Sequence, residues 1–430
     1  MFASKANDVL RIKKLNTLFL SYDGMTDSLG QSQVIPYLIG LSKSGYSISI
    51  ISCEKQEAYK KNHQHIEQLL APYSIEWFPL SYTKKPPVLS TLKDLYRMNK
   101  RMQQLHREKK FNLIHCRSYL TSLIGKQFCV KMNLPFIFDM RGFWADERIE
   151  GGIWKLSNPL FNSIYRFFKQ KELEYANSAA ATVSLTHAGK LEIQSWNIDK
   201  AQKEKIYVIP CSADFELFAI PSNLQRQAAR ARLNWNETNF VLTYLGSLGT
   251  WYLLHEMLDF YSVLKEKIPT AKLYIISGDA PQLVYDAATV KGISMDDIVI
   301  ESAKRAEVPQ KLAASDWGIS FIKPSFSKKA SSPTKMGEML AMGIPLLVNS
   351  GVGDVAQIVE QTQGGICIDS FTKESYMVAI DKMKLGNLLP AQQIREKSFE
   401  IYGLENAIKT YVGIYTMCTH KIANKDIETL

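Results

Sequence analysis

The segment 331-SSPTKMGEMLAMGIPLLVNS-350 places hydroxyl groups and a lysine directly before a predicted helix. The first turn of a helix presents free backbone N–H groups and the positive end of the helix dipole, and this combination binds anions. Thr334 and Lys335 lie where their side chains would add to such a site. The segment therefore has the chemistry of a phosphate site, and the alternative is a capped helix with a solvated lysine.

Polar or glycine-rich residues also follow five of the predicted strands. They are the loop 21-SYDGMTDSLG-30, the turn 139-DMRG-142, Thr186 with His187, the loop 246-GSLGT-250, and Lys323. In an open α/β sheet, ligands bind beyond the carboxyl ends of the strands. We therefore expect these positions to converge on one site.

The elements that must position these residues follow an alternating pattern. Short β-branched or aromatic runs alternate with longer amphipathic segments, which is typical of parallel sheets with crossover helices. The first series of predicted strands is 17–21, 47–52, 74–80, 112–117, 135–140, 180–186 and 205–211. The second series is 239–247, 271–279, 297–302, 317–323, 345–350 and 364–369, after a polar connection around 220–239. The sequence therefore predicts an α/β fold with two sheets.

Bulk properties exclude several classes of protein. Apolar residues make up 46% and charged residues 22% of the chain, which favours a globular protein over a disordered or fibrous one. No apolar run approaches the ~18 residues that span a bilayer, and the first residues do not resemble a secretory signal, so we expect a cytoplasmic protein. The six cysteines show no metal-ligand spacing, so we expect reduced thiols and no bound metal.

The formal charge of +10 is concentrated in one segment. Nine Lys or Arg residues and two acids lie between Lys84 and Lys110. Apolar residues at helical spacing (Leu92, Leu95, Met98, Met102 and Leu105) predict a helix within residues 88–110 with one packed and one basic face. The basic face suits contact with an anionic membrane or simple solvation. Nucleic acid is disfavoured, because no aromatic residues are interleaved for base stacking.

Four stretches carry a resemblance to a known family: 23-DGMTDSLGQSQVIPYL-38, 138-FDMRGFWADER-148, 208-VIPCSADFELF-218 and 332-SPTKMGEMLAMGIPLLVNSGVGD-354. The chain resembles the retaining nucleotide-sugar glycosyltransferases of the GT-B fold, in particular glycosyltransferase family 4, from about residue 15 to about residue 417. The resemblance implies two Rossmann-like domains that face a cleft, and no required metal or other cofactor. It implies an acceptor-binding domain at 1–215, joined by a returning helix at 403–430, and a donor-binding domain at 216–402.

The resemblance also implies roles for residues of the donor site. Glu338 stands where family members bind the ribose hydroxyls, and a carboxylate is a natural acceptor for two neighbouring hydroxyl groups. Thr334, Lys335 and the helix N-terminus would bind the donor diphosphate. Gly24 and Gly30 stand in the loop that approaches this diphosphate, where an ordinary strand-to-helix turn is the alternative. The remaining predicted donor contacts are Ser247, Gly249, Lys323 and Ser332.

Other residues are implied to lie at the transferred sugar and the acceptor. Asp139 stands at a strand end where relatives carry a histidine or aspartate that contacts the transferred sugar. Arg141 would orient that carboxylate or bind an acceptor anion, and Asp139, Arg141 and Lys335 form the predicted catalytic set. Glu147 and His187 are further candidates for acceptor or sugar contacts, with a salt bridge and a structural histidine as their alternatives.

The sequence departs from the family pattern in two places. Many members carry two glutamates separated by seven residues, and here Ala330 replaces the first. Many also carry an arginine and a lysine after the first strand of the second domain, where this chain reads 246-GSLGTW-251. The cations that neutralise the diphosphate must then come from elsewhere, and the local supply is Lys323, Lys328, Lys329 and Lys335.

The sequence thus predicts a glycosyltransferase that builds a bacterial surface polysaccharide or a lipid-linked glycan at the inner face of the cytoplasmic membrane. Its partners would be a nucleotide sugar, a glycan or lipid-linked acceptor, and an anionic membrane, with no nucleic acid. A nucleotide-sugar epimerase of the same fold is one alternative, although no convincing acid/base set is evident. A non-catalytic binding or scaffold subunit is the other, favoured by the two departures.

Overall fold

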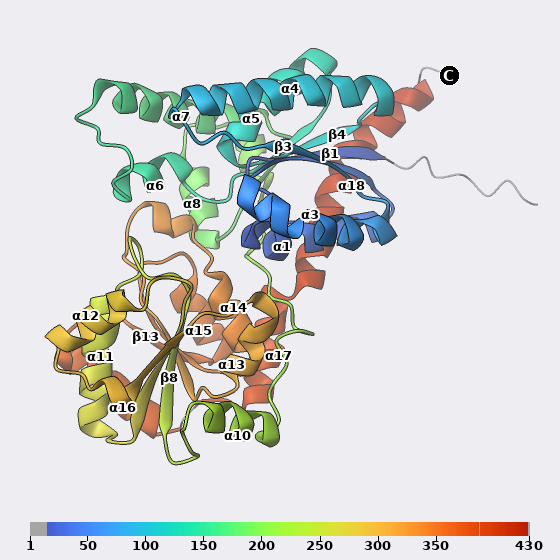
Figure 1. Ribbon diagram of the computed structural model, residues 1–430. Coiled ribbons are helices and arrows are strands. Elements are labelled where there is room, and N and C mark those ends of the chain that lie inside the picture. The colour runs from blue at the N-terminus through green and yellow to red at the C-terminus, as the bar shows by residue number, and fades with distance from the viewer. Residues whose placement is uncertain (1–14, 387, 429–430) are drawn as a thin grey trace, which may run out of the picture.

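The computed structural model describes residues 15–386 and 388–428. These residues form two α/β domains, each with one parallel sheet, and the final helix runs from the second domain back to the first (Figure 1). Each of the thirteen predicted strand segments overlaps one strand of the structure. Residues 1–14 and 429–430, which the predicted first domain includes, lie outside the described residues.

The first sheet has seven strands in the order β3-β2-β1-β4-β5-β6-β7. They are β1 (Asn16–Ser21), β2 (Ser47–Glu54), β3 (Glu76–Ser81), β4 (Leu113–Arg117), β5 (Phe136–Asp139), β6 (Ala181–Ser184) and β7 (Ile206–Val208). The strand order reverses between β1 and β4, where Ser21 lies opposite Arg117 at the carboxyl ends of the two strands. Such a reversal opens a crevice for ligands.

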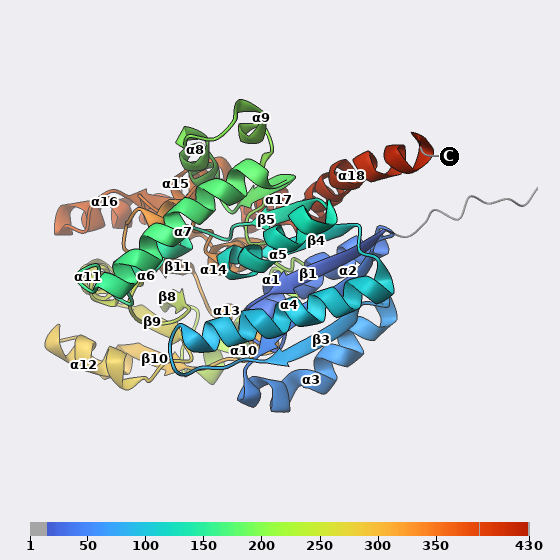
Figure 2. The same ribbon diagram turned by 90° about the horizontal axis from the view of Figure 1, so that it is seen from above.

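Different sets of helices cover the two faces of this sheet (Figure 2). Alternate residues of the strands are buried under each set. One face is covered by α4 (Leu89–Lys109), α5 (Ser118–Met132) and α7 (Pro159–Ser178). The other is covered by α2 (Ile35–Lys43) and α3 (Gln56–Leu70) together with the final helix, α18 (Leu404–Glu428). Shorter helices connect these layers: α1 (Ser28–Gln33), α6 (Trp144–Glu150), α8 (His187–Ser195) and α9 (Lys200–Lys203).

The second sheet has six parallel strands in the order β10-β9-β8-β11-β12-β13. They are β8 (Phe240–Leu245), β9 (Ala271–Ile276), β10 (Ile298–Glu301), β11 (Trp317–Ser320), β12 (Leu346–Asn349) and β13 (Gly365–Ile368). The helices are α10 (Asn223–Arg232), α11 (Leu254–Lys267), α12 (Gln282–Val290), α13 (Val308–Leu312), α14 (Thr334–Ala341), α15 (Val355–Thr362), α16 (Lys373–Lys384) and α17 (Ala391–Tyr402). The strand order reverses between β8 and β11, so this sheet also opens a crevice at its carboxyl edge.

Helix α18 packs closely against α2 of the first domain. A side chain at Gly40 would overlap Ile408 of α18, so the absence of a Cβ atom allows this approach. Tyr411 and Tyr415 of α18 are buried in the core under the first sheet. The chain thus crosses between the domains a second time, and α18 contributes to the interior near the site described below.

The basic segment forms helix α4 as predicted, with one correction. Leu95, Met98 and Met102 are buried, but Leu92 is 57% exposed and does not join the packed face. Asp94 is buried instead, because its carboxylate accepts hydrogen bonds from the backbone and side chain of Thr83. In the described part of the chain, every helix is too short or too polar to cross a membrane.

Candidate functional site

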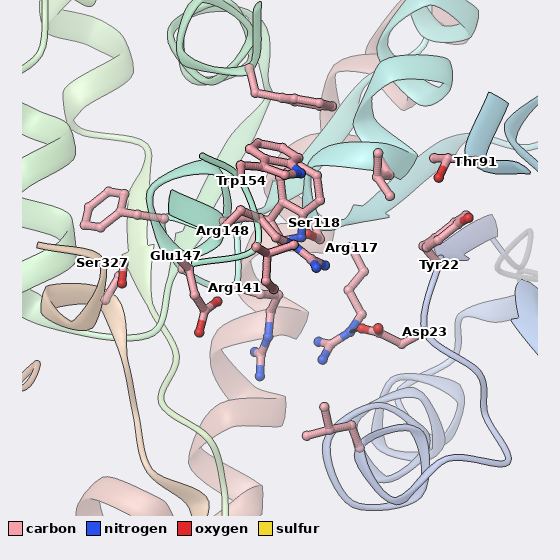
Figure 3. Close-up of a pocket in the computed structure, with 18 of the residues that line it drawn as sticks. Tyr22, Asp23, Thr91, Arg117, Ser118, Arg141, Glu147, Arg148, Trp154 and Ser327 are labelled. Atoms are coloured by element: carbon pink, nitrogen blue, oxygen red, sulfur yellow. Dashed lines mark ion pairs between the residues drawn. The ribbon is translucent and has the colours of Figure 1, made fainter. Parts of the chain in front are cut away.

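A cavity of about 1020 Å³ lies between the two domains (Figure 3). The first domain contributes residues that follow three adjacent strands: Asp23 after β1, Ser118 after β4 and Arg141 after β5. The second domain contributes Trp251 and the segment that ends at Thr334, the first residue of α14. The cavity therefore connects the carboxyl edge of the first sheet with the N-terminus of α14.

The floor of the cavity holds a buried cluster of charges around Asp139. Its carboxylate lies 3.9 Å from both Arg117 and Arg141, and 3.5 Å from Nε2 of His115. The hydroxyl of Tyr411 donates a hydrogen bond of 3.3 Å to the same carboxylate. Burial alone would raise the pKa of Asp139, but Arg141 and His115 outweigh it and the pKa lies below its usual value. Asp139 is therefore an anion held under two guanidinium groups.

His115 is buried in the same cluster. Burial lowers its pKa below the usual value, although Asp139 acts in the opposite direction. Its Nδ1 atom lies 2.9 Å from the hydroxyl of Tyr415. Arg117 also lies 3.5 Å from the carboxylate of Asp23, so the floor of the cavity holds two guanidinium groups and two carboxylates.

The backbone at this edge is held in left-handed conformations. Ser118, Arg141 and Gly142 have φ angles of 70°, 58° and 117°. Non-glycine residues adopt such angles infrequently, and they concentrate at functional sites where surrounding structure holds them. Figure 3 shows the guanidinium groups of Arg141 and Arg117 pointing in the same direction, with that of Arg117 beside Asp23.

The structure separates Asp139 from the cavity surface, although the sequence places it in the catalytic set. Asp139 is 2% exposed, and Arg141 rather than Asp139 lines the cavity. Arg141 also donates to the Sγ atom of Cys211 at 3.4 Å. The carboxylate therefore acts on the cavity through the orientation of Arg141.

The predicted phosphate segment reaches the cavity with its first residues. Ser332, Pro333 and Thr334 line it, and the Ser332 hydroxyl accepts a hydrogen bond of 3.1 Å from the backbone N–H of Cys211 in the first domain. Lys335 lies one residue further along α14 and is 43% exposed. The N-terminus of α14 thus faces the carboxyl edge of the first sheet.

Glu338 lies on the buried side of the same helix, and its carboxylate pairs with two cations. Its fully buried carboxylate accepts hydrogen bonds from Lys335 at 3.0 Å and from Arg305 at 2.7 Å. Arg305 follows β10 and was missed in the sequence, although the strand-end rule applied to β10 would have pointed to it. Two cations are therefore gathered beside α14.

Glu147 and Lys328 link the domains across the cavity. Their side chains form an ion pair of 2.7 Å, and Nζ of Lys328 lies 3.8 Å from the centre of the Trp251 ring. Ala330, which replaces the family glutamate, also lines the cavity, so this position offers a methyl group there. Glu147 therefore forms a salt bridge in this structure, which is the alternative that the sequence offered to an acceptor or sugar contact.

Other predicted site residues lie around the cavity. Cβ atoms at Gly24 and Gly30 would lie 2.6 Å from the Glu54 carboxylate and from Cα of Met25, so packing by itself requires both glycines. The same loop lines the cavity through Asp23 and Leu29.

The remaining predicted residues lie at the surface, three on loops and His187 at the start of α8. Ser247, Gly249, Lys323 and His187 are all exposed. Among the described residues, these four stay outside the cavity lining, as do Asp139, Lys335 and Glu338. The backbone N–H of His187 donates to the carboxylate of Asp354, which shows a contact between the domains at this point.

Both halves of the sequence match a family model. Residues 35–217 match Glycosyltransferase Family 4, and residues 225–398 match Glycosyl transferases group 1. No curated protein matches the sequence.

Solved structures share the fold over nearly the whole chain. HepE from Anabaena in complex with UDP and glucose is 13% identical, with a TM-score of 0.66 over 94% of this chain and 99% of that chain. WaaG, a glycosyltransferase involved in lipopolysaccharide biosynthesis, is 13% identical, with a TM-score of 0.62 over 90% and 97%. A structure from Listeria monocytogenes assigned as a UDP-N-acetylglucosamine 2-epimerase is 12% identical, with a TM-score of 0.59 over 95% of this chain and 97% of that chain.

These likenesses concern the fold, while the two family models identify the kind of protein. The models together span both sheets, and the two parallel sheets have the GT-B arrangement. The chain belongs to the GT-B glycosyltransferases of family 4, group 1, and is a glycosyltransferase.

Proposed function

We propose that the protein transfers a sugar from a nucleoside-diphosphate sugar to a glycan or lipid-linked acceptor in the synthesis of a bacterial surface polysaccharide. In this proposal the sugar keeps its anomeric configuration, and no metal takes part. The observation that carries the proposal is the cavity in which the N-terminus of α14 faces Arg117 and Arg141. The UDP in the HepE complex and the lipopolysaccharide role of WaaG support the choice of substrates.

Departure of a nucleoside diphosphate leaves negative charge that the site must stabilise. We assign this task to the N–H groups of α14, Thr334, Lys335 and Arg305, because fixed cations and dipoles in a closed cleft stabilise developing charge most effectively. Glu338 keeps Lys335 and Arg305 in place and is assigned to the ribose hydroxyls. These cations take the place of the Arg/Lys pair that the chain lacks after β8.

The acceptor side is assigned to Arg141, with Asp139 as the residue that positions it. As the bond from the anomeric carbon to the diphosphate oxygen breaks, the acceptor oxygen forms the new bond on the same face of the sugar. The departing phosphate then takes the acceptor's proton, so the site needs no pair of catalytic carboxylates. Closure of the two domains would exclude water during this step.

The proposal is tested by thermal shift with UDP, GDP, ADP and TDP and their sugars. One nucleotide series should raise the melting temperature of the wild type and leave the melting temperature of Glu338→Ala unchanged. Thr372→Ala, a helix cap distant from the cavity, serves as the control and should keep the wild-type response. If no nucleotide stabilises the wild type, the donor site does not work and the scaffold alternative becomes the better account.

An epimerase would share both the fold and the nucleotide response, so product analysis separates the two enzymes. An epimerase converts the donor sugar without an acceptor, whereas a glycosyltransferase releases nucleoside diphosphate only as the new glycoside forms or as water replaces the acceptor. Nuclear magnetic resonance of the donor after incubation distinguishes these products and also reports the anomeric configuration of the glycoside.

We further propose that the basic face of α4 contacts an anionic membrane. Lys93, Lys100 and Arg107 are exposed on this helix, and each basic residue near an anionic surface contributes about 1 kcal/mol. Vesicles that contain anionic lipid should sediment the protein, and vesicles of neutral lipid should not. Equal sedimentation with both would remove the membrane contact from the proposal.

A further inference from the structure

One end of the cavity continues into an apolar groove of the first domain. The groove runs between helices α4, α5 and α7, and the loop that connects α6 to α7 closes one side. Its lining includes Leu92, Leu95, Leu123, Trp154, Ile164 and Phe167. A nucleotide sugar and a glycan are both strongly polar, so neither of them needs such a surface.

The outer end of the groove opens between exposed apolar side chains. Leu92 and Phe167 line the groove and are also exposed to solvent. Further exposed apolar residues surround this opening on α4, on the α6–α7 loop and at the start of α7: Leu89, Tyr96, Ile153, Leu156 and Leu160. Contiguous exposed apolar residues of this kind mark an interaction site, because single ones would be scattered over the surface.

The inner end of the groove is cationic. Arg148 lines the cavity with its guanidinium 5.0 Å from the centre of the Trp144 ring, and it has no carboxylate partner among the described residues. Arg117 and Arg141 follow further in. Nε of Arg117 and Nη1 of Arg141 lie 3.5 and 3.9 Å from the carboxylates of Asp23 and Asp139, and neither nitrogen has a hydrogen-bond partner within the described chain. Figure 3 shows Trp154 close to Arg148, with Arg141 and Arg117 beyond it.

We propose that the acceptor is an anionic amphiphile, a lipid-linked phosphate whose hydrocarbon chain lies in the apolar groove and whose phosphate is bound by Arg148, Arg117 and Arg141. This inference rests on the proposed transferase function and narrows its acceptor to one class. Both parts of such a molecule fit the groove. A hydrocarbon chain fits the leucine and aromatic walls, and an anion offsets Arg148 and accepts hydrogen bonds from Arg117 and Arg141. The groove opens at α4, the helix assigned to the membrane, so the chain would enter from the bilayer side.

The first test measures the affinity of hexyl, octyl and decyl phosphate by titration calorimetry below their micelle concentrations. Each added methylene that is buried in the groove should tighten binding about fourfold. Inorganic phosphate supplies the same anion without a chain and should bind far more weakly than decyl phosphate. Equal affinity across the alkyl series would overturn the proposal.

Variants separate the groove from general surface effects. Leu92→Asp and Phe167→Asp should each lower the affinity for decyl phosphate at least tenfold and leave the affinity for inorganic phosphate unchanged. Leu224→Asp changes a leucine that is also helical and exposed, but lies on α10 away from the cavity, and should retain the wild-type affinity. Arg148→Gln should lower the affinity for all three alkyl phosphates by the same factor, about tenfold.

The folding of each variant is followed by its melting temperature. Ile153→Asp lies in the α6–α7 loop rather than in a helix, so it tests the groove if a helical variant fails to fold. If the groove variants fold and keep the full dependence on chain length, the hydrocarbon lies elsewhere and the proposal is wrong.

The nucleotide thermal shift distinguishes this failure from failure of the proposed function. A nucleotide response without chain-length dependence leaves the transferase proposal intact and rejects the lipid acceptor. Chain-length dependence without any nucleotide response supports the groove as an amphiphile site and rejects its role in sugar transfer.

Discussion

At the scale of single residues, compensation between buried charges shapes the site. Asp139 offsets part of the charge of Arg117 and Arg141, and Glu338 holds Lys335 and Arg305 beside α14. Removal of one member of such a buried group leaves the others uncompensated, which is more costly than the pair itself is stabilising. Both carboxylates therefore fix the positions of these cations.

Replacement of Lys335 by alanine tests this view of the donor site. Lys335 is partly exposed, and Arg305 still pairs with Glu338 after its loss, so the free energy of unfolding should fall by less than about 1 kcal/mol. Loss of a cation that faces the developing charge should lower kcat by about 10²-fold. Steady-state kinetics and urea unfolding measure the two effects.

Lys373→Ala is the matched control, because Lys373 is also a partly exposed lysine in an ion pair, with Glu266 on the second domain. Its loss should leave kcat unchanged. Full activity in Lys335→Ala would contradict the assignment of this lysine to the diphosphate.

At the scale of elements, helix α7 carries a wall of the groove and a buried carboxylate behind it. The Glu172 carboxylate accepts a hydrogen bond of 2.7 Å from Tyr119 and pairs with Lys169. Burial raises its pKa from 4.5 to about 7, although Lys169 acts in the opposite direction. The aromatic side chains of Tyr119 and Phe168 pack around the same turn of the helix. The Glu172 carboxylate therefore titrates within the layer of side chains that packs behind the groove.

The raised pKa of Glu172 predicts a dependence of stability on pH. The folded state binds the proton more tightly than the unfolded state does, so the stabilisation is complete below pH 4.5 and is lost as the pH rises towards 7. The free energy of unfolding should fall by up to about 3 kcal/mol over this range. In Glu172→Gln this fall should be absent, as urea unfolding at several pH values would show.

Glu174→Gln controls for charge removal on the same helix. Glu174 is partly exposed and its pKa is lowered by Lys126 and Lys171, although burial alone would raise it. It contributes stability above its unfolded pKa, so its loss should not remove the fall between pH 4.5 and 7. A wild-type pH profile in Glu172→Gln would show that another group causes the fall.

At the scale of the whole molecule, the domains are joined by two reciprocal carboxylate contacts. Glu150 of the first domain accepts hydrogen bonds from the backbone N–H groups of Phe326 and Ser327 in the second. Asp354 of the second domain accepts from the backbone N–H groups of His187 and Ala188 in the first. Each contact needs the other domain at hydrogen-bonding distance, so together they hold the cavity in its present width.

The double variant Glu150→Gln, Asp354→Asn should therefore open the molecule. Neutral amides make weaker hydrogen bonds to these N–H groups than carboxylates do, by about 1 kcal/mol for each contact. The radius of gyration from small-angle X-ray scattering should increase relative to the wild type. Glu266→Gln removes an exposed carboxylate away from the domain contact and should not change it. Identical scattering from the double variant would show that other contacts hold the domains together.

Much of the fold and part of the site could be predicted from local patterns. The strands are short runs of β-branched and aromatic residues, and their positions follow from neighbours in sequence. The strand-end rule pointed to Arg141 and the helix rule to Thr334, and both line the cavity. Arg117 and Arg305 were missed although each stands at or just after a strand end, because neither stands in a stretch that resembles the family.

The sequence by itself determined that the chain forms two parallel sheets with crossover helices, and it determined which loops lie at their carboxyl edges. Only the tertiary structure decided that Asp139 is buried behind Arg141, that Arg305 reaches Glu338, and that Leu92 faces a groove rather than the core. The physical reason is the separation along the sequence over which each kind of interaction acts. Helix and strand periodicity depends on residues a few positions apart, whereas these contacts depend on how helices from distant parts of the chain pack against one another.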